Sequence, residues 1–224
     1  MRLMPSSRVL VLAAPAAVLA AAAPSFAAPE MAPLKPCYVS VDRGQREKLR
    51  TVATGFTPDA KVSITVGGAT QDGMANHFGI VDLRRTAAPY RRRGETPFSV
   101  TVTELANPLN TVTGWSRVTA LDARLRPREA NTSDRVRFVG RGFTAARPIW
   151  GHYVLHGHPK KTVRLARRPS SVCGRFSVRR RQFPMRHVRP GLWTLQIDQQ
   201  HRWAPQPQTV FKTIAIRVTR IIGA

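Results

Sequence analysis

The sequence predicts an all-β protein made of two tandem β-sandwich domains. Short runs of alternating apolar and polar residues are separated by Gly and Pro, a pattern typical of strands joined by tight turns. No run has the apolar spacing of a long amphipathic helix. A Gly-Phe-Thr corner occurs at residues 55–57 and again at residues 142–144, each time between two strand-like runs. This repetition indicates a duplicated unit of about 90 residues.

Each half of the chain contains enough strands for one sandwich. In the first half we expect strands at residues 37–41, 49–54, 61–66, 79–85, 98–104 and 111–120. In the second half we expect strands at residues 121–126, 135–139, 149–155, 161–166, 175–179, 192–198 and 210–220. Six or seven short strands per half are typical of an immunoglobulin-like sandwich. We therefore expect a linker at residues 28–36 and domains at residues 37–119 and 120–222, with a short junction that limits their relative motion.

A second match supports the duplication. Gly79 precedes Phe98 by 19 positions, and Gly174 precedes Trp193 by the same 19 positions. Each aromatic residue begins an alternating run, FSVTVTE or WTLQIDQ. We expect both side chains to point into a core, because alternate residues of a strand share one face of the sheet.

Residues 1–27 have the features of a secretory signal peptide. Arg2 and Arg8 supply a positive start, residues 9–23 are apolar, and Ser25 and Ala27 are small residues at the two positions that signal peptidase recognises. The apolar run is shorter than the roughly 20 residues of a membrane-spanning helix. We expect cleavage after Ala27 and a protein that is secreted or associated with the cell surface.

The chain is strongly basic. It contains 36 Lys and Arg against 12 Asp and Glu, a formal charge of +24, and loss of Arg2 and Arg8 with the signal peptide leaves +22. Such a charge attracts polyanions in a salt-sensitive way. Export excludes nucleic acid as the partner in vivo and favours an anionic cell-wall polymer or a membrane surface. GC-rich codon usage is an alternative explanation of the basic charge: it accounts for the preference for Arg over Lys, and less well for the scarcity of acids. The local peaks of charge are Arg91, Arg92, Arg93, Arg179, Arg180 and Arg181.

Three closely spaced histidines are the main candidates for a metal site. These are His152, His156 and His158. Alternation along residues 149–155 places Ile149, Tyr153 and Leu155 on the inner face of a strand, which leaves His152 facing outward. The sequence shows no carboxylate near them. We therefore interpret the histidines as surface residues and expect no metal ligand and no cofactor.

The two cysteines, Cys37 and Cys173, fall in different predicted domains. An exported protein favours disulfides, but a bridge between the domains requires the two α-carbons to lie within about 7 Å. A disulfide, two free thiols and an intermolecular bond all remain open.

An enzyme is the alternative hypothesis. His156-Gly157 followed by residues 170–175, SSVCGR, resembles the HG and SHGC motifs of peptidoglycan L,D-transpeptidases. In that family Cys173 would be the nucleophile. The His and Gly that should precede the Cys are Ser171 and Val172, so the activating base is missing. We therefore predict no catalytic residues.

A loop near the C-terminus is the best candidate for a ligand site. Trp203 lies in a His/Arg/Pro-rich segment at residues 199–208, where an exposed aromatic could contact carbohydrate. We interpret Trp193 as a core residue. The candidate ligand patch is Trp203, Arg202, His201 and Arg189.

Two segments resemble known proteins. Residues 52–66, VATGFTPDAKVSITV, resemble the opening strands of bacterial immunoglobulin-like repeats in secreted and surface proteins. Residues 152–199 are similar to uncharacterised exported proteins of high-GC bacteria, which carry no assigned activity. The favoured hypothesis is a non-catalytic binding or structural module at the cell envelope. The alternatives are a degenerate cysteine-dependent cell-wall enzyme and a pair of carbohydrate-binding accessory domains.

Overall fold

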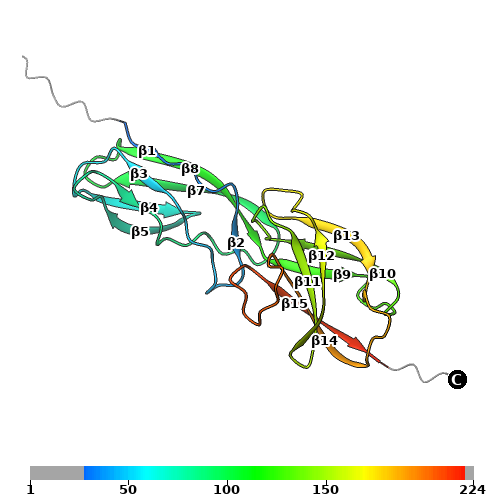
Figure 1. The fold of residues 1–224 in the computed structure, drawn as a ribbon. Helices are drawn as coiled ribbons and strands as arrows, with labels where there is room; N and C mark the ends of the chain where they lie inside the picture. Colours follow the sequence, from blue (N-terminus) through cyan, green and yellow to red (C-terminus); the bar gives the residue numbers. More distant parts are fainter. Residues whose placement is uncertain (1–27, 220–224) are drawn as a thin grey trace, which may run out of the picture.

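The computed structural model describes residues 28–219, which form an all-β protein, as the sequence predicts. The predicted signal peptide, residues 1–27, lies outside the described residues. Residues 28–219 contain 15 strands in four sheets and form two lobes arranged end to end (Figure 1). None of their elements is a helix long and apolar enough to cross a membrane.

The first lobe packs a five-stranded sheet, in the order β2-β8-β7-β4-β5, against a three-stranded sheet, β1-β3-β6. Its strands are β1 (Glu30–Met31), β2 (Tyr38–Ser40), β3 (Val52–Thr54), β4 (Lys61–Val66), β5 (Ala69–Met74), β6 (Val81–Asp82), β7 (Glu95–Glu104) and β8 (Thr111–Ala120). Alternating residues of β4 and β7 form the core, because Val62, Ile64, Val100 and Val102 are buried while their neighbours along each strand are more exposed.

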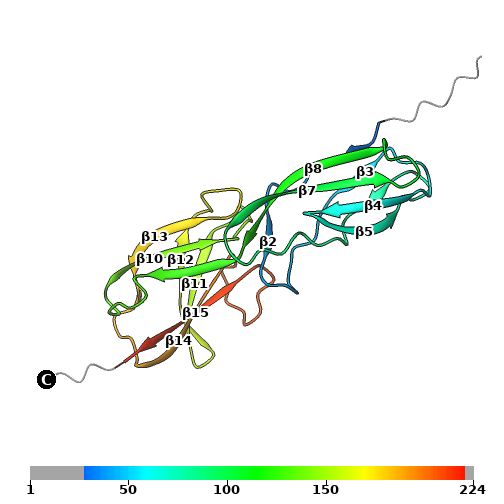
Figure 2. The same cartoon turned by 180° about the vertical axis from the view of Figure 1, so that it is seen from behind.

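The second lobe packs a four-stranded sheet, β12-β11-β14-β15, against a three-stranded sheet, β13-β10-β9 (Figures 1 and 2). Its strands are β9 (Asp122–Arg126), β10 (Arg135–Arg141), β11 (Ile149–Leu155), β12 (His158–Ala166), β13 (Phe176–Arg181), β14 (Gly191–Asp198) and β15 (Lys212–Val218). In both lobes the chain order of the strands within the two sheets is that of an immunoglobulin-like sandwich.

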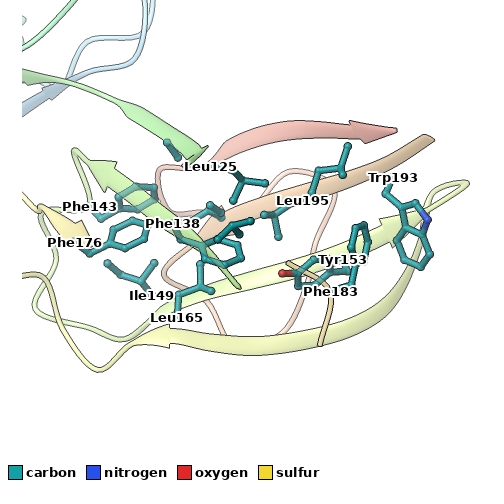
Figure 3. Packing of buried hydrophobic residues seen from close by; sticks show 14 of the residues in the cluster. Leu125, Phe138, Phe143, Ile149, Tyr153, Leu165, Phe176, Phe183, Trp193 and Leu195 are labelled. Carbon is teal, nitrogen blue, oxygen red and sulfur yellow. The ribbon is translucent and has the colours of Figure 1, made fainter. Parts of the chain in front are cut away.

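Aromatic side chains fill the second core (Figure 3). Phe143 and Phe176 pack edge to face with ring centroids 5.5 Å apart, and Phe183 meets Trp193 in the same way at 5.3 Å. Tyr153 lies beside Phe183, and its hydroxyl donates to the carbonyl of Gln182 at 2.6 Å. Burial raises the pKa of Tyr153. Each such buried side chain contributes about 2 kcal/mol to folding.

The duplicated corner adopts the same structure in both lobes. The N–H of Phe56 donates to the carbonyl of Gly79 at 3.2 Å, and the N–H of Phe143 donates to that of Gly174 at 3.3 Å. A Cβ on Gly79 would lie 2.1 Å from the backbone of Phe56. A Cβ on Gly174 would lie 2.3 Å from the backbone of Phe143. Only glycine allows this close approach, so the sequence repeat reports a repeated backbone contact.

Several contacts join the lobes. Only Leu121 separates β8 from β9, and its N–H donates to the carbonyl of Ser40 at 2.9 Å. Val39, from the first lobe, is 2% exposed and packs in the second core. Cys37 and Cys173 form a disulfide across the junction, with α-carbons 5.2 Å apart.

Polar contacts reinforce the same junction. Glu95 in β7 accepts from Arg175 of the second lobe at 2.7 Å. Lys35 binds Glu47 and also donates to Oγ1 of Thr144 at 2.9 Å. The covalent and polar links together hold the lobes in one arrangement.

The main differences from the sequence prediction are in two strands at the edges of their sheets. The ranges predicted for β4, β8 and β11 match, whereas β1 and β5 were not predicted at all. Both are edge strands of their sheets. Residues 69–74 are exposed or half-buried, so β5 has no alternation of apolar residues that would mark it as a strand.

Candidate functional site

The loop at residues 199–211, between β14 and β15, covers the outer face of the β11–β14 pair. The prediction of surface histidines is wrong for His152, which is fully buried. Ile149, Tyr153 and Leu155 do face the core, so the alternation was assigned correctly. The error lies on the other face, where the loop folds back over the sheet and the imidazole of His201 packs against Trp150 at 4.5 Å between ring centroids.

His152 is held at both ring nitrogens. Nε2 lies 3.2 Å from Oδ1 of Asp198 and 3.1 Å from the carbonyl oxygen of Gln200. Because both are acceptors, Nε2 carries the proton and donates it. Nδ1 lies 2.9 Å from Oγ1 of Thr162, whose hydroxyl can donate to it. The expected lack of a nearby carboxylate is therefore wrong as well, since Asp198 is brought in from a neighbouring strand.

Gln196 and Asp198 complete this buried polar cluster. Gln196 donates through Nε2 to Oδ2 of Asp198 at 2.8 Å and to the carbonyl of Ala204 at 3.0 Å. The N–H of Gln200 donates to Oδ1 of Asp198 at 2.8 Å. Three strands and the loop are thus tied together by side chains that the sequence separates by up to 46 positions.

The cluster has the connectivity of a hydrolase triad, with Thr162, His152 and Asp198 in line. The side chains of His152 and Asp198 are both 0% exposed, and every polar atom named above already has a protein partner. A general base must reach the proton it abstracts from a bound substrate, and here the loop occupies that space. What the arrangement does is fix the loop to the sheet.

The other two histidines lie in a hairpin. His156 and Gly157 form the two-residue turn between β11 and β12, with φ values of 51° and 77°. Positive φ at both central residues is what a type I′ hairpin turn requires. The resemblance to a catalytic HG motif therefore has a structural explanation. Within residues 28–219 no group of three or more His, Cys, Asp or Glu side chains could hold a metal ion.

The disulfide removes the nucleophile that the enzyme alternative needs. Cys173 is bonded to Cys37, and both residues are buried. A cysteine attacks as a thiolate, which a bonded sulfur cannot supply. The neighbouring Gly174 accepts a hydrogen bond from the N–H of Phe143, and its lack of a side chain allows the two backbones to approach closely.

Part of the predicted ligand patch lines a surface cleft. His201, Arg202 and Trp203 lie along a cleft of about 690 Å³ whose remaining walls are loop residues and Arg147. Trp203 is half-buried rather than exposed, and its Nε1 has no hydrogen-bond partner among the described residues. Arg189 is not part of this cleft. Arg189 lies just before the start of β14, where its carbonyl accepts a hydrogen bond from Nε1 of Trp193 at 2.9 Å. The loop that lines the cleft follows the opposite end of β14.

The two arginine triplets have different surroundings. Residues 91–93 are exposed in the connection between β6 and β7. Residues 179–181 lie in β13, so their side chains alternate between faces. Arg180 is paired with the buried Val136 and points to the core side of the sheet edge, whereas Arg179 and Arg181 point outward. The triplet at residues 179–181 therefore contributes side chains to both faces of its sheet.

Comparison with known proteins shows no assigned family. No family model and no curated protein matches the chain. Among solved structures, it is similar to a Ca²⁺-stabilised adhesin that helps an Antarctic bacterium bind ice, with 13% identity, a TM-score of 0.32, and 84% of this chain aligned to 48% of that one. It is also similar to a tetra-tandem repeat in the extending region of a large adhesion protein, with 12% identity, a TM-score of 0.28, and coverages of 82% and 49%. The chain spans about half the length of both.

Proposed function

We propose that this protein is an exported, non-catalytic binding module of the cell envelope that contacts anionic polymers through its basic surface. The disulfide supports export, because such bonds persist in oxidising compartments. The fixed loop and the bonded Cys173 leave neither His152 nor the cysteine free for catalysis.

One observation carries the proposal: most of the Lys and Arg side chains in residues 28–219 form no ion pair. Among residues 28–219, the only Lys and Arg in ion pairs are Lys35, Arg84, Arg117, Arg124 and Arg175. The acids are too few to neutralise the rest. Unpaired surface cations lose little solvation when they meet a polyanion, and each contact releases counterions from it.

Retention on purified cell wall at low and high salt tests the proposal. Residues 28–224 should bind at low salt and elute as salt rises. Replacing residues 91–93 and 179–181 by Ser should weaken retention. Retention that is equal at low and high salt would contradict the electrostatic account. Binding to a neutral polysaccharide that survives high salt would instead favour the cleft beside Trp203.

A further inference from the structure

The outer face of the three-stranded sheet in the second lobe is an array of arginines. Most of the side chains that alternate outward from β9, β10 and β13 are exposed arginines, whereas Asp122, Val139 and Arg141 on the same face are half-buried. We call this surface the arginine face; its members are Arg124, Arg126, Arg135, Arg137, Arg179 and Arg181. The three strands form one sheet, in the order β13-β10-β9, and are labelled in Figure 1.

Strand register places these arginines directly beside one another. Arg137 is paired with Arg126 on one side and with Arg179 on the other, which makes a row of three across the sheet. Arg135 is paired with Arg181 in the next row. Neighbouring strands lie about 4.8 Å apart and successive outward residues about 6.7 Å apart along a strand.

Charge is not balanced on this face. The acidic residue on this face is Asp122, whose Oδ2 lies 3.9 Å from Nε of Arg124. None of the other five arginines forms an ion pair within residues 28–219. Like charges directly opposite each other destabilise a sheet, so folding alone does not favour this arrangement.

The first lobe shows that the high arginine content of the chain does not by itself place arginines on every exposed sheet. There the outer face of the β4, β5, β7 and β8 sheet carries paired threonines. Thr101 and Thr113 are bonded at 2.9 Å, and Thr103 and Thr111 at 2.8 Å. The same chain carries threonine on one exposed sheet and arginine on the other, so the arginine face is a property of that surface.

We propose that the arginine face binds a linear polymer that carries phosphate groups along its backbone. This inference rests on the proposed function and deepens it by naming the surface and the ligand class. Arginine matches the geometry of phosphate oxygens through its planar fork of N–H donors. Successive phosphates of an extended chain can meet successive rows of guanidinium groups, and the bound anion removes the repulsion between Arg126, Arg137 and Arg179.

A polymer fits this face better than a bilayer does. Peripheral helices that hold to membranes combine basic residues with apolar side chains that enter the lipid. Most of the exposed large apolar residues, among them Trp115, Phe78 and Leu109, lie in the other lobe. Val172 and Leu192 are exposed in the second lobe, but neither belongs to β9, β10 or β13. The exposed side chains of this face are mainly arginine, which suits an extended anionic chain lying across it.

A charge-matched pair of variants tests the inference. One variant is Arg126→Gln, Arg137→Gln and Arg179→Gln, which removes the central row. The control is Arg164→Gln, Arg167→Gln and Arg168→Gln, three exposed arginines in β12 and the turn after it. Both lose the same net charge. Binding of each protein to linear inorganic polyphosphate is measured at several salt concentrations.

The row variant should lose at least tenfold in affinity. Each phosphate contact contributes about 0.7 to the slope of log affinity against log salt, so loss of three contacts should make that slope shallower by about 2. The control should change by less than threefold. Equal losses in both variants would overturn the arginine face while leaving the proposed function intact. No binding of the wild-type protein to any anionic polymer at low salt would overturn both.

Two further probes identify the ligand class. Poly-glutamate carries carboxylates instead of phosphates, and vesicles containing an anionic phospholipid present phosphates on a bilayer. Weaker binding to both than to polyphosphate supports the proposal. Equal or tighter binding to poly-glutamate or to vesicles, lost in the row variant, would overturn the assignment to a phosphate polymer.

Discussion

Removing the disulfide should destabilise the protein more than any single surface change. The double substitution Cys37→Ala and Cys173→Ala opens a covalent loop of 136 residues. In the chain-entropy model, a loop of that length restricts the unfolded chain by about 5 kcal/mol at ~25 °C. Both side chains are buried, and alanine avoids placing an unpaired hydroxyl at the junction.

Guanidinium unfolding followed by tryptophan fluorescence and by circular dichroism measures this loss. Trp193 is buried in the second core, so its fluorescence reports on that lobe, whereas Trp115 is mostly exposed and circular dichroism follows the strands of both lobes. We expect a loss of several kcal/mol, and the single variant Cys37→Ala should lose nearly as much because it breaks the same bond. A loss below about 1 kcal/mol would show that the two lobes unfold separately, and would refute the view that the bridge constrains the whole chain.

Three smaller changes test individual contacts. Arg137→Thr should raise stability by about 0.5 kcal/mol, because it relieves repulsion from both neighbouring strands; an unchanged or lower unfolding midpoint would contradict this. His152→Ala should cost about 3 kcal/mol, because it leaves Asp198 buried without one of its donors, and a cost under 1 kcal/mol would show that the cluster does not hold the loop. Hydrogen bonds from Arg117, and then Arg175, hold the pKa of Glu95 below its usual value of 4.5. Glu95→Gln should therefore cost about 1 kcal/mol above pH 4.5, after screening by solvent at the exposed arginines. This difference from the wild type should shrink as pH falls below 4.5 and vanish once pH is below the lowered pKa of the folded state. A difference independent of pH would refute the ion pair.

The fold was predictable because its main strands alternate. Val62, Ile64 and Val66 in β4 repeat every second residue, and the Gly-Phe-Thr corner marked the duplication. The edge strand β5 lacked this alternation, because neither of its faces is buried. The Gly67-Gly68 pair, which makes a two-residue turn between β4 and β5, was the available signal for a hairpin there.

The surroundings of His152 could not be predicted from local sequence. Alternation identifies the two faces of a strand but does not say what covers the outer one. Asp198 becomes a neighbour only through the register of β11 with β14, and the loop that seals the site is irregular. The arginine face illustrates the same limit. Its members are scattered along the sequence, and only the pairing of three strands aligns Arg126, Arg137 and Arg179.

We propose that binding is electrostatic and directed at a phosphate-bearing polymer. Titration of residues 28–224 with such a polymer, repeated across a range of salt concentrations, tests it most directly. If the six members of the arginine face each contact one phosphate, log affinity should fall against log salt with a slope of about −4. A slope near zero, or no binding at low salt, would contradict the account.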